Sequence, residues 1–232
     1  DYEKAIRWLK RAAKQHNSHA HYVLGLCYYY GFGFKENSGK AVDYFTKAFE
    51  AGSLEAQYRL GICVLAGEGV EQDYSFGFQL LNEVYNSGIE QSSYWLGWCY
   101  LNGLGIERDY EKALEYFTEA EEENARANYQ LGRMYRMGYG CKLDYAKAFE
   151  FFMKAAEGGD ISGQMAIGRA FYRGEGVSED NFEAVKWFKL AHENGDDDAT
   201  YYMGECLYNG YGTDENEEEA IVYLKQAAEQ NN

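Results

Sequence analysis

The sequence contains no proline among its 232 residues, whereas average usage of about 5% would give roughly twelve. Proline removes a backbone donor and clashes with the preceding helical turn, so its absence is typical of a chain that is nearly all helix. The chain also lacks any run of the roughly 18 apolar residues that a membrane-spanning helix needs. We therefore expect a helical protein without membrane insertion.

Positive charge and histidine are scarce. Lys and Arg number 22 against 38 Asp and Glu, which gives a net charge of −16. Phosphate backbones and anionic membranes would be repelled, so nucleic acid is excluded as a partner. Three of the four histidines, His16, His19 and His21, lie around one predicted helix junction. They point to different sides of a helix start with no Cys nearby, so we interpret them as solvated and predict no metal site.

What the chain has is an internal repeat. A Gly-x-Gly pair recurs at successive offsets of 36, 36, 35, 36 and 36 residues, at Gly31/Gly33, Gly67/Gly69, Gly103/Gly105, Gly138/Gly140, Gly174/Gly176 and Gly210/Gly212. Fixed periods of this size are the signature of stacked repeat architectures.

Each Gly-x-Gly pair follows a predicted helix, which we call helix A. Its face repeats a small residue, then an apolar residue followed by glycine, then an apolar or aromatic residue, at i, i+4 and i+8. The apolar-glycine step occurs at Leu24-Gly25, Leu60-Gly61, Leu96-Gly97, Leu131-Gly132, Ile167-Gly168 and Met203-Gly204. Glycine adopts the left-handed conformation that ends helices, so helix A should stop at the Gly-x-Gly.

A second predicted helix, helix B, begins four residues after each pair. The residue there can accept hydrogen bonds from the first free amides, and is Asn37, Asp73, Asp109, Asp144, Asp180 or Asn216. Asp1 occupies the same position at the start of the sequence. Neither helix buries its apolar stripe alone, so the helices must stack. We predict an all-α solenoid of antiparallel helix pairs with about 13 helices, in which residues 1–232 form one array that is a fragment of a longer chain.

The repeated pattern A-x-x-x-L-G-x-x-Y-x-x-G-x-G-V-x-x-D-x-x-K-A-x-x-[WYF]-[FL]-x-x-A-A-x-x-G resembles the Sel-one-like repeat family, relatives of the tetratricopeptide repeats. Ala127 to Gly159 carries nearly all of it, and the resemblance covers the full chain. It implies a right-handed superhelix that serves as an adaptor for protein complexes, generally without catalysis. Two modules depart from it: Gly77 replaces the usual Ala, and the third module is one residue short near Glu123. We expect the superhelix angles to change around residues 77 to 126.

The cysteines do not predict disulfides. Some secreted members of the family bridge paired helices, but here four cysteines share one column of helix A, and the fifth, Cys141, lies in a loop. The column is Cys27, Cys63, Cys99 and Cys206. Equivalent positions in stacked modules are too far apart for a disulfide, so we interpret these residues as small core hydrophobes. Reduced thiols favour a cytoplasmic location.

No pattern indicates an enzyme. The Gly-x-Gly loops lack the Gly-Lys-Ser/Thr and the preceding strand of a phosphate cradle, and Ser-x-x-Lys is absent from the chain. No acid, base and nucleophile come together. We predict no catalytic residue and no cofactor.

Helix A carries a second stripe that differs between modules, and five of the nine arginines fall on its 24 positions. By analogy with related solenoids, this stripe lines the concave surface, where such arrays hold ligands. Because arginine binds carboxylates in a bidentate way, we expect an acidic peptide or a C-terminal carboxylate. The predicted partner-binding residues are Arg59, Trp95, Trp98, Arg126, Gln130, Arg133, Arg169, Arg173 and Tyr202.

Two alternatives remain open. Trp95 and Trp98 either form an exposed binding wall or pack against the next module, filling space left by Gly77 and Ser92. For the whole chain, the leading hypothesis is a non-catalytic scaffold that holds a partner protein or peptide. The alternative is a structural or regulatory arm of a larger multidomain enzyme, which the uncapped B helices at both ends favour.

Overall fold

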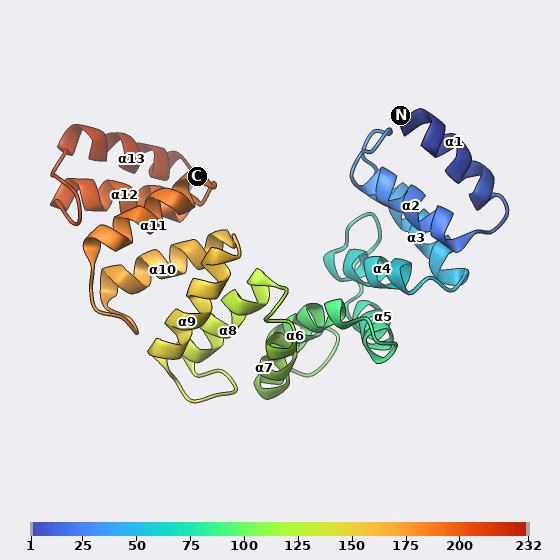
Figure 1. Ribbon diagram of the computed structural model, residues 1–232, viewed down its shortest axis with the longest axis horizontal. Coiled ribbons are helices and arrows are strands. Elements are labelled where there is room, and N and C mark those ends of the chain that lie inside the picture. The colour runs from blue at the N-terminus through green and yellow to red at the C-terminus, as the bar shows by residue number, and fades with distance from the viewer. Residues whose placement is uncertain (1, 231–232) are drawn as a thin grey trace. The chain divides into compact units, whose positions relative to one another are not determined.

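The computed structural model describes residues 2–230, and their regular structure consists of thirteen α-helices and one 3₁₀ turn, Glu90–Ser92 (Figure 1). The A helices are α2 (Ser18–Tyr29), α4 (Leu54–Ala66), α6 (Ser93–Asn102), α8 (Ala125–Met137), α10 (Ile161–Arg173) and α12 (Asp197–Asn209). The B helices are α1 (Tyr2–Ala13), α3 (Ser38–Glu50), α5 (Tyr74–Asn86), α7 (Tyr110–Glu119), α9 (Tyr145–Glu157), α11 (Asn181–Glu193) and α13 (Glu217–Gln230). The predicted α-solenoid fold is confirmed.

The chain divides into two compact units, Asp1–Tyr116 and Phe117–Asn232, with the boundary inside α7. In unit 1, α3 packs against α2 on one side and α4 on the other, and α4 packs against α5. In unit 2, each helix from α8 to α13 packs against the next one along the chain. That residues 1–232 form a single array stays a prediction.

Side-chain caps set the starts of the helices. All six predicted caps of the described B helices form: the Lys40 amide donates to Asn37 Oδ1 over 2.8 Å, and the equivalent bonds measure 3.0 to 3.1 Å, at Asp73, Asp109, Asp144, Asp180 and Asn216. Asp1 lies outside the described residues. The A helices have a second set of caps, formed by Asn17, Ser53, Asn124, Asp160 and Asp196.

The third module is irregular, as its missing residue indicates. Both α6 and α7 have ten residues, whereas the other helices have 12 to 14. Ser92 takes the small-residue position of helix A in this module, but it ends a 3₁₀ turn and forms no side-chain cap. In the second module, α5 continues through Gly77, where a Cβ atom would lie 2.8 Å from Leu65 Cγ. The absence of a side chain there makes room for the buried Leu65.

The twelve glycines of the Gly-x-Gly pairs all have positive φ, between 66° and 77°. The first glycine caps α4, α6, α8, α10 and α12, whereas α2 ends one residue earlier, with Tyr30 at its cap. The second glycine contacts the preceding module. A Cβ atom on Gly176 would lie 2.0 Å from the carbonyl oxygen of Tyr145, the first residue of α9. Similar close approaches occur at Gly69, Gly105 and Gly212.

The glycine within five of the A helices, α2, α4, α8, α10 and α12, allows helix B to pack closely. A Cβ atom on Gly168 would lie 2.5 Å from the ring of Phe188, which is fully buried. Equivalent pairs are Gly25/Phe45, Gly132/Phe152, Gly61/Leu81 and Gly204/Leu224. The cysteines behave as the sequence indicates: all five are free, and Cys27, Cys63, Cys99 and Cys206 are buried. These contacts bury the repeated stripe of each of these A helices in the core. The variable stripe lies next to it on the same helix.

Candidate functional site

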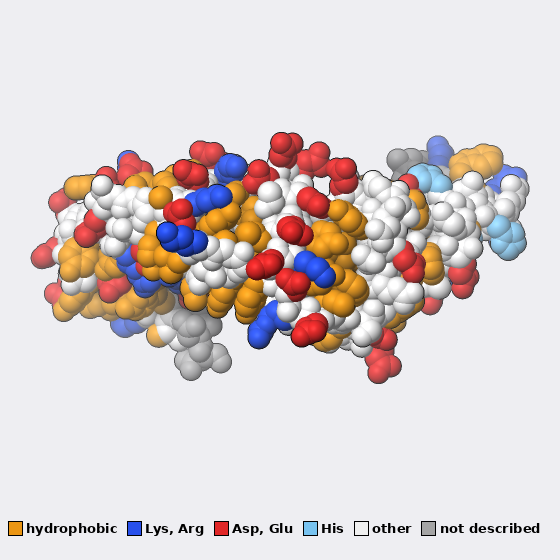
Figure 2. Space-filling view, turned by 90° about the horizontal axis from the view of Figure 1, so that it is seen from below, with side chains coloured by type: hydrophobic (Ala, Val, Ile, Leu, Met, Phe, Trp, Pro, Cys, Tyr) orange, Lys and Arg blue, Asp and Glu red, His pale blue; other side chains and the backbone are white. Residues whose placement is uncertain are grey.

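The predicted partner-binding residues are divided between the two units. Arg59, Trp95 and Trp98 lie in unit 1, and the other six lie in unit 2. Each group is therefore described by itself. Figure 2 shows that acidic side chains are spread over the face in view and that Lys and Arg form smaller groups among them.

In unit 1, the aromatic residues of the stripe are largely packing residues. Trp95 is half-buried and packs against a core cluster that contains Leu96 and Cys99. Its ring meets that of Trp98 edge to face, with centroids 6.2 Å apart. Arg59 lies over the ring of Tyr58 at 6.0 Å, and its buried Nε atom has no hydrogen-bond partner among the described residues. Trp95 therefore packs in the core of its own and the preceding module, not against the next module as the packing alternative has it, and its role in binding a partner stays a prediction.

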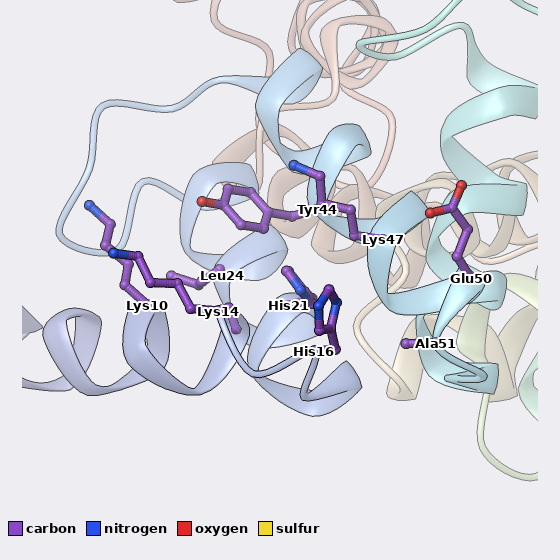
Figure 3. Close-up of a pocket in the computed structure, with 10 residues that line it drawn as sticks. Lys10, Lys14, His16, His21, Leu24, Tyr44, Lys47, Glu50 and Ala51 are labelled. Carbon is purple, nitrogen blue, oxygen red and sulfur yellow. The ribbon is translucent and has the colours of Figure 1, made fainter.

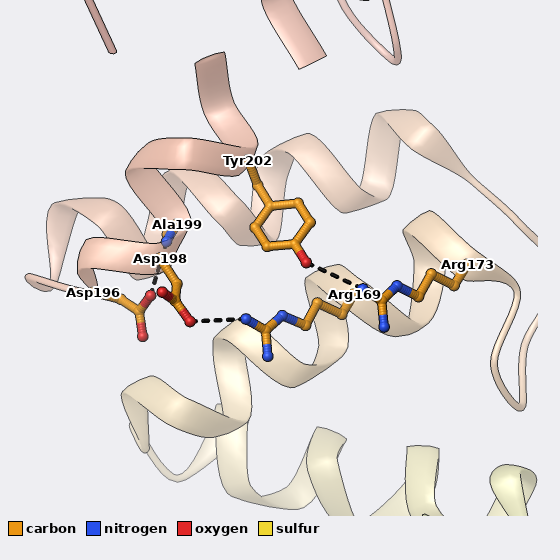
Figure 4. A network of polar contacts seen from close by, with 6 residues as sticks. All are labelled: Arg169, Arg173, Asp196, Asp198, Ala199 and Tyr202. Carbon is orange, nitrogen blue, oxygen red and sulfur yellow. Dashed lines mark hydrogen bonds and ion pairs between the residues drawn. The ribbon is translucent and has the colours of Figure 1, made fainter. Parts of the chain in front are cut away.

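In unit 2, the arginines of α10 bind the next A helix, α12. Arg169 Nη2 lies 2.9 Å from Asp198 Oδ2, and its guanidinium lies over the ring of Tyr202 at 5.3 Å. Arg173 Nη2 donates to the Tyr202 hydroxyl over 3.3 Å (Figure 4). Three predicted partner-binding residues therefore hold two modules together.

A further arginine joins this network, one that sequence reasoning left out of the site. Arg136 Nε lies 2.9 Å from Glu175 Oε2, and Arg173 Nη1 lies 3.8 Å from the other oxygen of that carboxylate. Arg136 follows Arg133 by three residues on α8, so helical spacing could have placed the two together. Glu175 lies between the two glycines of a loop, where the sequence offers no such signal.

Arg133 differs from the other arginines of this face. Its side chain is exposed, and it donates from Nη1 to Gln130 Oε1 over 3.0 Å while lying over the ring of Tyr129 at 5.8 Å. Within residues 2–230 no carboxylate pairs with it. Gln130 is only 8% exposed, so it orients Arg133 instead of lying open to a ligand. Arg126 is exposed at the start of α8.

A cavity of about 370 Å³, which we call the arginine cavity, lies between α8 and α10. Three arginines line it, Arg133, Arg136 and Arg169, together with two carboxylates, Asp196 and Asp198. Tyr129, Met137 and Tyr139 supply apolar surface. Burial raises the pKa of Asp196, and the hydrogen bond from the Ala199 amide opposes that rise. The charges of the lining residues sum to +1, in a chain whose net charge is −16.

The described residues contain no group of three or more His, Cys, Asp or Glu side chains that could hold a metal ion. Across residues 2–230, no helix is both long and apolar enough to cross a membrane. What the arginine cavity can do chemically is to hold a carboxylate or another planar anion against a guanidinium.

Comparison with known proteins decides the family. The Sel1 repeat model matches residues 91–124, 125–160, 161–196 and 197–232. The chain belongs to the Sel1 repeat family. The first modules of this Sel1 repeat protein, residues 1–92, match a model of plant tetratricopeptide repeats. Proteins of the Sel1 family are generally non-enzymatic scaffolds that bind other proteins.

Two solved structures are similar over almost the whole chain. The first is c5321, a protective antigen of uropathogenic Escherichia coli with an SLR fold; it is 31% identical, with a TM-score of 0.81 over 99% of this chain. The present chain spans 50% of that protein's length. The second is a Sel1 repeat protein from Oxalobacter formigenes, 26% identical, with a TM-score of 0.85 over 97% of this chain and 91% of its own. The comparison with curated proteins gave no match.

Proposed function

We propose that this chain is a non-catalytic scaffold that binds a partner protein or peptide on the A-helix face of unit 2, where a partner carboxylate contacts Arg133. The observation that carries the proposal is the arginine cavity, in which Arg133 is exposed and has no carboxylate partner among the described residues. Binding of proteins is typical of Sel1 repeats.

The neighbouring charges favour Arg133 as the first contact. Arg136 and Arg169 are already paired, with Glu175 and Asp198, so a ligand gains less from them. Gln130 and the ring of Tyr129 hold the Arg133 guanidinium in place, which reduces the entropy that binding would cost. A guanidinium offers two parallel donors to a carboxylate, a stronger contact than a neutral hydrogen bond.

A peptide titration tests the proposal. Three fluorescein-labelled peptides are compared by anisotropy: one rich in Asp and Glu with a free C-terminus, the same peptide amidated, and a version with Lys in place of the acids. We expect the acidic peptide with the free carboxylate to bind most tightly. Arg133→Glu should weaken it by about tenfold or more, since a hydrogen bond to a charged group contributes roughly 1.5–3 kcal/mol.

The matched control is Arg108→Glu, which makes the same charge reversal at an exposed loop residue of unit 1. It should leave the affinity within about twofold of wild type, because Arg108 does not line the arginine cavity and an exposed charge outside the contact contributes little. Equal losses in the two variants would mean that net charge alone governs binding. Binding that survives Arg133→Glu would refute the assignment of this residue.

A further inference from the structure

A histidine in the first module occupies a position that glycine fills elsewhere. The loops that follow α3, α5, α9 and α11 each contain a glycine with φ between 83° and 92°, namely Gly52, Gly88, Gly159 and Gly195. In the loop after α1 this residue is His16, with φ of 58°. It is the one non-glycine residue with positive φ among residues 2–230. Such backbone strain is frequently found at functional sites.

His16 lies at a pocket of about 750 Å³ between α1, α2 and α3, which we call the basic pocket (Figure 3). Five basic side chains line it, Lys10, Lys14, His16, His21 and Lys47, against a single acid, Glu50. In Figure 3 the two histidines lie together at the centre, whereas the Glu50 carboxylate points away from them. A chain with 38 acids and 22 bases would not be expected to gather these charges in one place.

The lysines of the basic pocket have no acidic partners among the described residues. Lys10 Nζ lies over the ring of Phe34 at 5.2 Å, and Lys47 Nζ lies over the ring of Tyr44 at 5.3 Å. Contacts with aromatic faces orient the ammonium groups without neutralising them. Their charge therefore remains available to a ligand.

His21 is a further polar group of the pocket, with a ring nitrogen that has no hydrogen-bond partner among the described residues. It is half-buried, its ring lies 6.0 Å from that of Tyr44, and that nitrogen is the buried Nδ1. Burial lowers the pKa of His21, and the charges of Lys47 and His16 lower it further, against a hydrogen bond with the Ala13 backbone. His21 therefore loses its proton more readily than a free histidine does, and the positive charge of the pocket comes from its three lysines.

We propose that the basic pocket binds the phosphate group of a small phosphate monoester whose apolar part lies against Tyr44. The pocket has no arginine among its lining residues, so the planar fork that suits a carboxylate is missing. Three ammonium groups instead act as point charges, a common way to bind phosphate. The volume exceeds that of one phosphate ion, and Tyr44, Ala13 and Ala51 add apolar wall.

Calorimetric titration of the full chain at low salt tests the proposal with three probes: phenyl phosphate, inorganic phosphate and phenylacetate. Phenyl phosphate should bind most tightly, inorganic phosphate more weakly and phenylacetate most weakly. Lys14→Gln and Lys47→Gln should each weaken phenyl phosphate about fivefold, the effect of losing one charge pair close to the surface. Lys35→Gln, which removes one exposed lysine of unit 1 outside the pocket, should leave the affinity unchanged.

The His16→Gly variant separates binding from folding. Glycine fits the positive φ, so the variant should melt at a higher temperature than wild type while binding phenyl phosphate more weakly. A variant that gains stability and keeps full affinity would show that His16 has no part in the site. The proposal is overturned if phenyl phosphate does not saturate the protein at millimolar concentration, if phenylacetate or inorganic phosphate binds equally well, or if Lys35→Gln is as harmful as Lys14→Gln.

Discussion

Single arginines of the A-helix face have different tasks, and the difference lies in their partners. Arg169 and Arg173 bind Asp198 and Tyr202 of the next A helix, whereas Arg133 binds an amide oxygen of its own helix. An arginine that binds a residue of the next module stabilises the stacking of the two modules, and its guanidinium already has a partner. An arginine without an acid is the one that gains most from a ligand carboxylate.

Asp160, the N-cap residue of α10, makes the stability of the protein depend on pH. Burial raises the pKa of Asp160, and the hydrogen bond from the Gly163 amide and the charge of Arg126 oppose that rise. A carboxyl with a higher pKa in the folded state binds protons more tightly when folded, so its contribution to stability falls as pH rises through that pKa. Asp160→Asn should therefore gain free energy of unfolding relative to wild type between about pH 4 and about pH 7.

Urea denaturation of both proteins at the two pH values measures this gain. The cap should persist in Asp160→Asn because Asn17 and Asn124 cap α2 and α8 in the same way. Asp160→Ala is the control: it loses the cap and should cost about 1 kcal/mol. A difference between Asp160→Asn and wild type that shrinks as pH rises would contradict the account.

The sequence predicted the residues of the variable stripe but could not predict which of them are engaged. Arg169 and Asp198 are 29 positions apart, and their contact depends on how α10 and α12 stack. Helical spacing alone places Arg133 and Arg169 on equivalent positions of their helices. The basic pocket was missed for a related reason. Its lysines and histidines come from α1, the loop after it, α2 and α3, and the sequence shows only that three of the histidines are close together.

At the scale of elements, the Gly-x-Gly loop both ends a helix and joins two modules. Gly174 needs only its positive φ, and a Cβ atom there would find its nearest neighbours at 3.6 Å. Gly176 needs a positive φ and also space, because the Tyr145 carbonyl oxygen lies 2.0 Å from where its Cβ would be. The two glycines therefore differ in how much they contribute to the stability of the fold.

Alanine at the two positions should separate these effects. Gly174→Ala places a side chain in the left-handed region and should cost about 1–2 kcal/mol. Gly176→Ala carries that cost and also forces α9 away from the loop, so it should lose about 3 kcal/mol or more in total. Thermal or urea unfolding gives both values. Equal losses at the two positions would show that the contact with α9 contributes nothing.

Most elements followed from the sequence because their signals are local. An Asn or Asp cap and a Gly-x-Gly stop lie within a few residues of the helix end that each one forms, so the B-helix starts were found at the right residues. The 3₁₀ turn at Glu90–Ser92 was missed, since nothing in the local pattern replaces the cap that the other described A helices have. Gly77 was expected to leave space that Trp95 and Trp98 could fill, but the structure has Leu65 against it.

At the scale of the whole molecule, a solenoid exposes its repeated helices to solvent. Its function therefore depends on which helix face binds the partner. Helices of the Sel1 type leave an A-helix face and a B-helix face available to partners. Our account assigns the protein partner to the A-helix face of unit 2, and a small phosphate monoester to the basic pocket of unit 1. The two sites lie in different units and can be altered separately.

Site-specific photo-crosslinking tests the central claim most directly. A photoreactive amino acid replaces either Met137, which is 55% exposed at the arginine cavity on α8, or Leu190, which is 38% exposed on the B helix α11. The account predicts that position 137 captures partner protein, that adding Arg133→Glu abolishes the capture, and that position 190 captures little. Equal capture from both positions, or capture from position 190 alone, would contradict it.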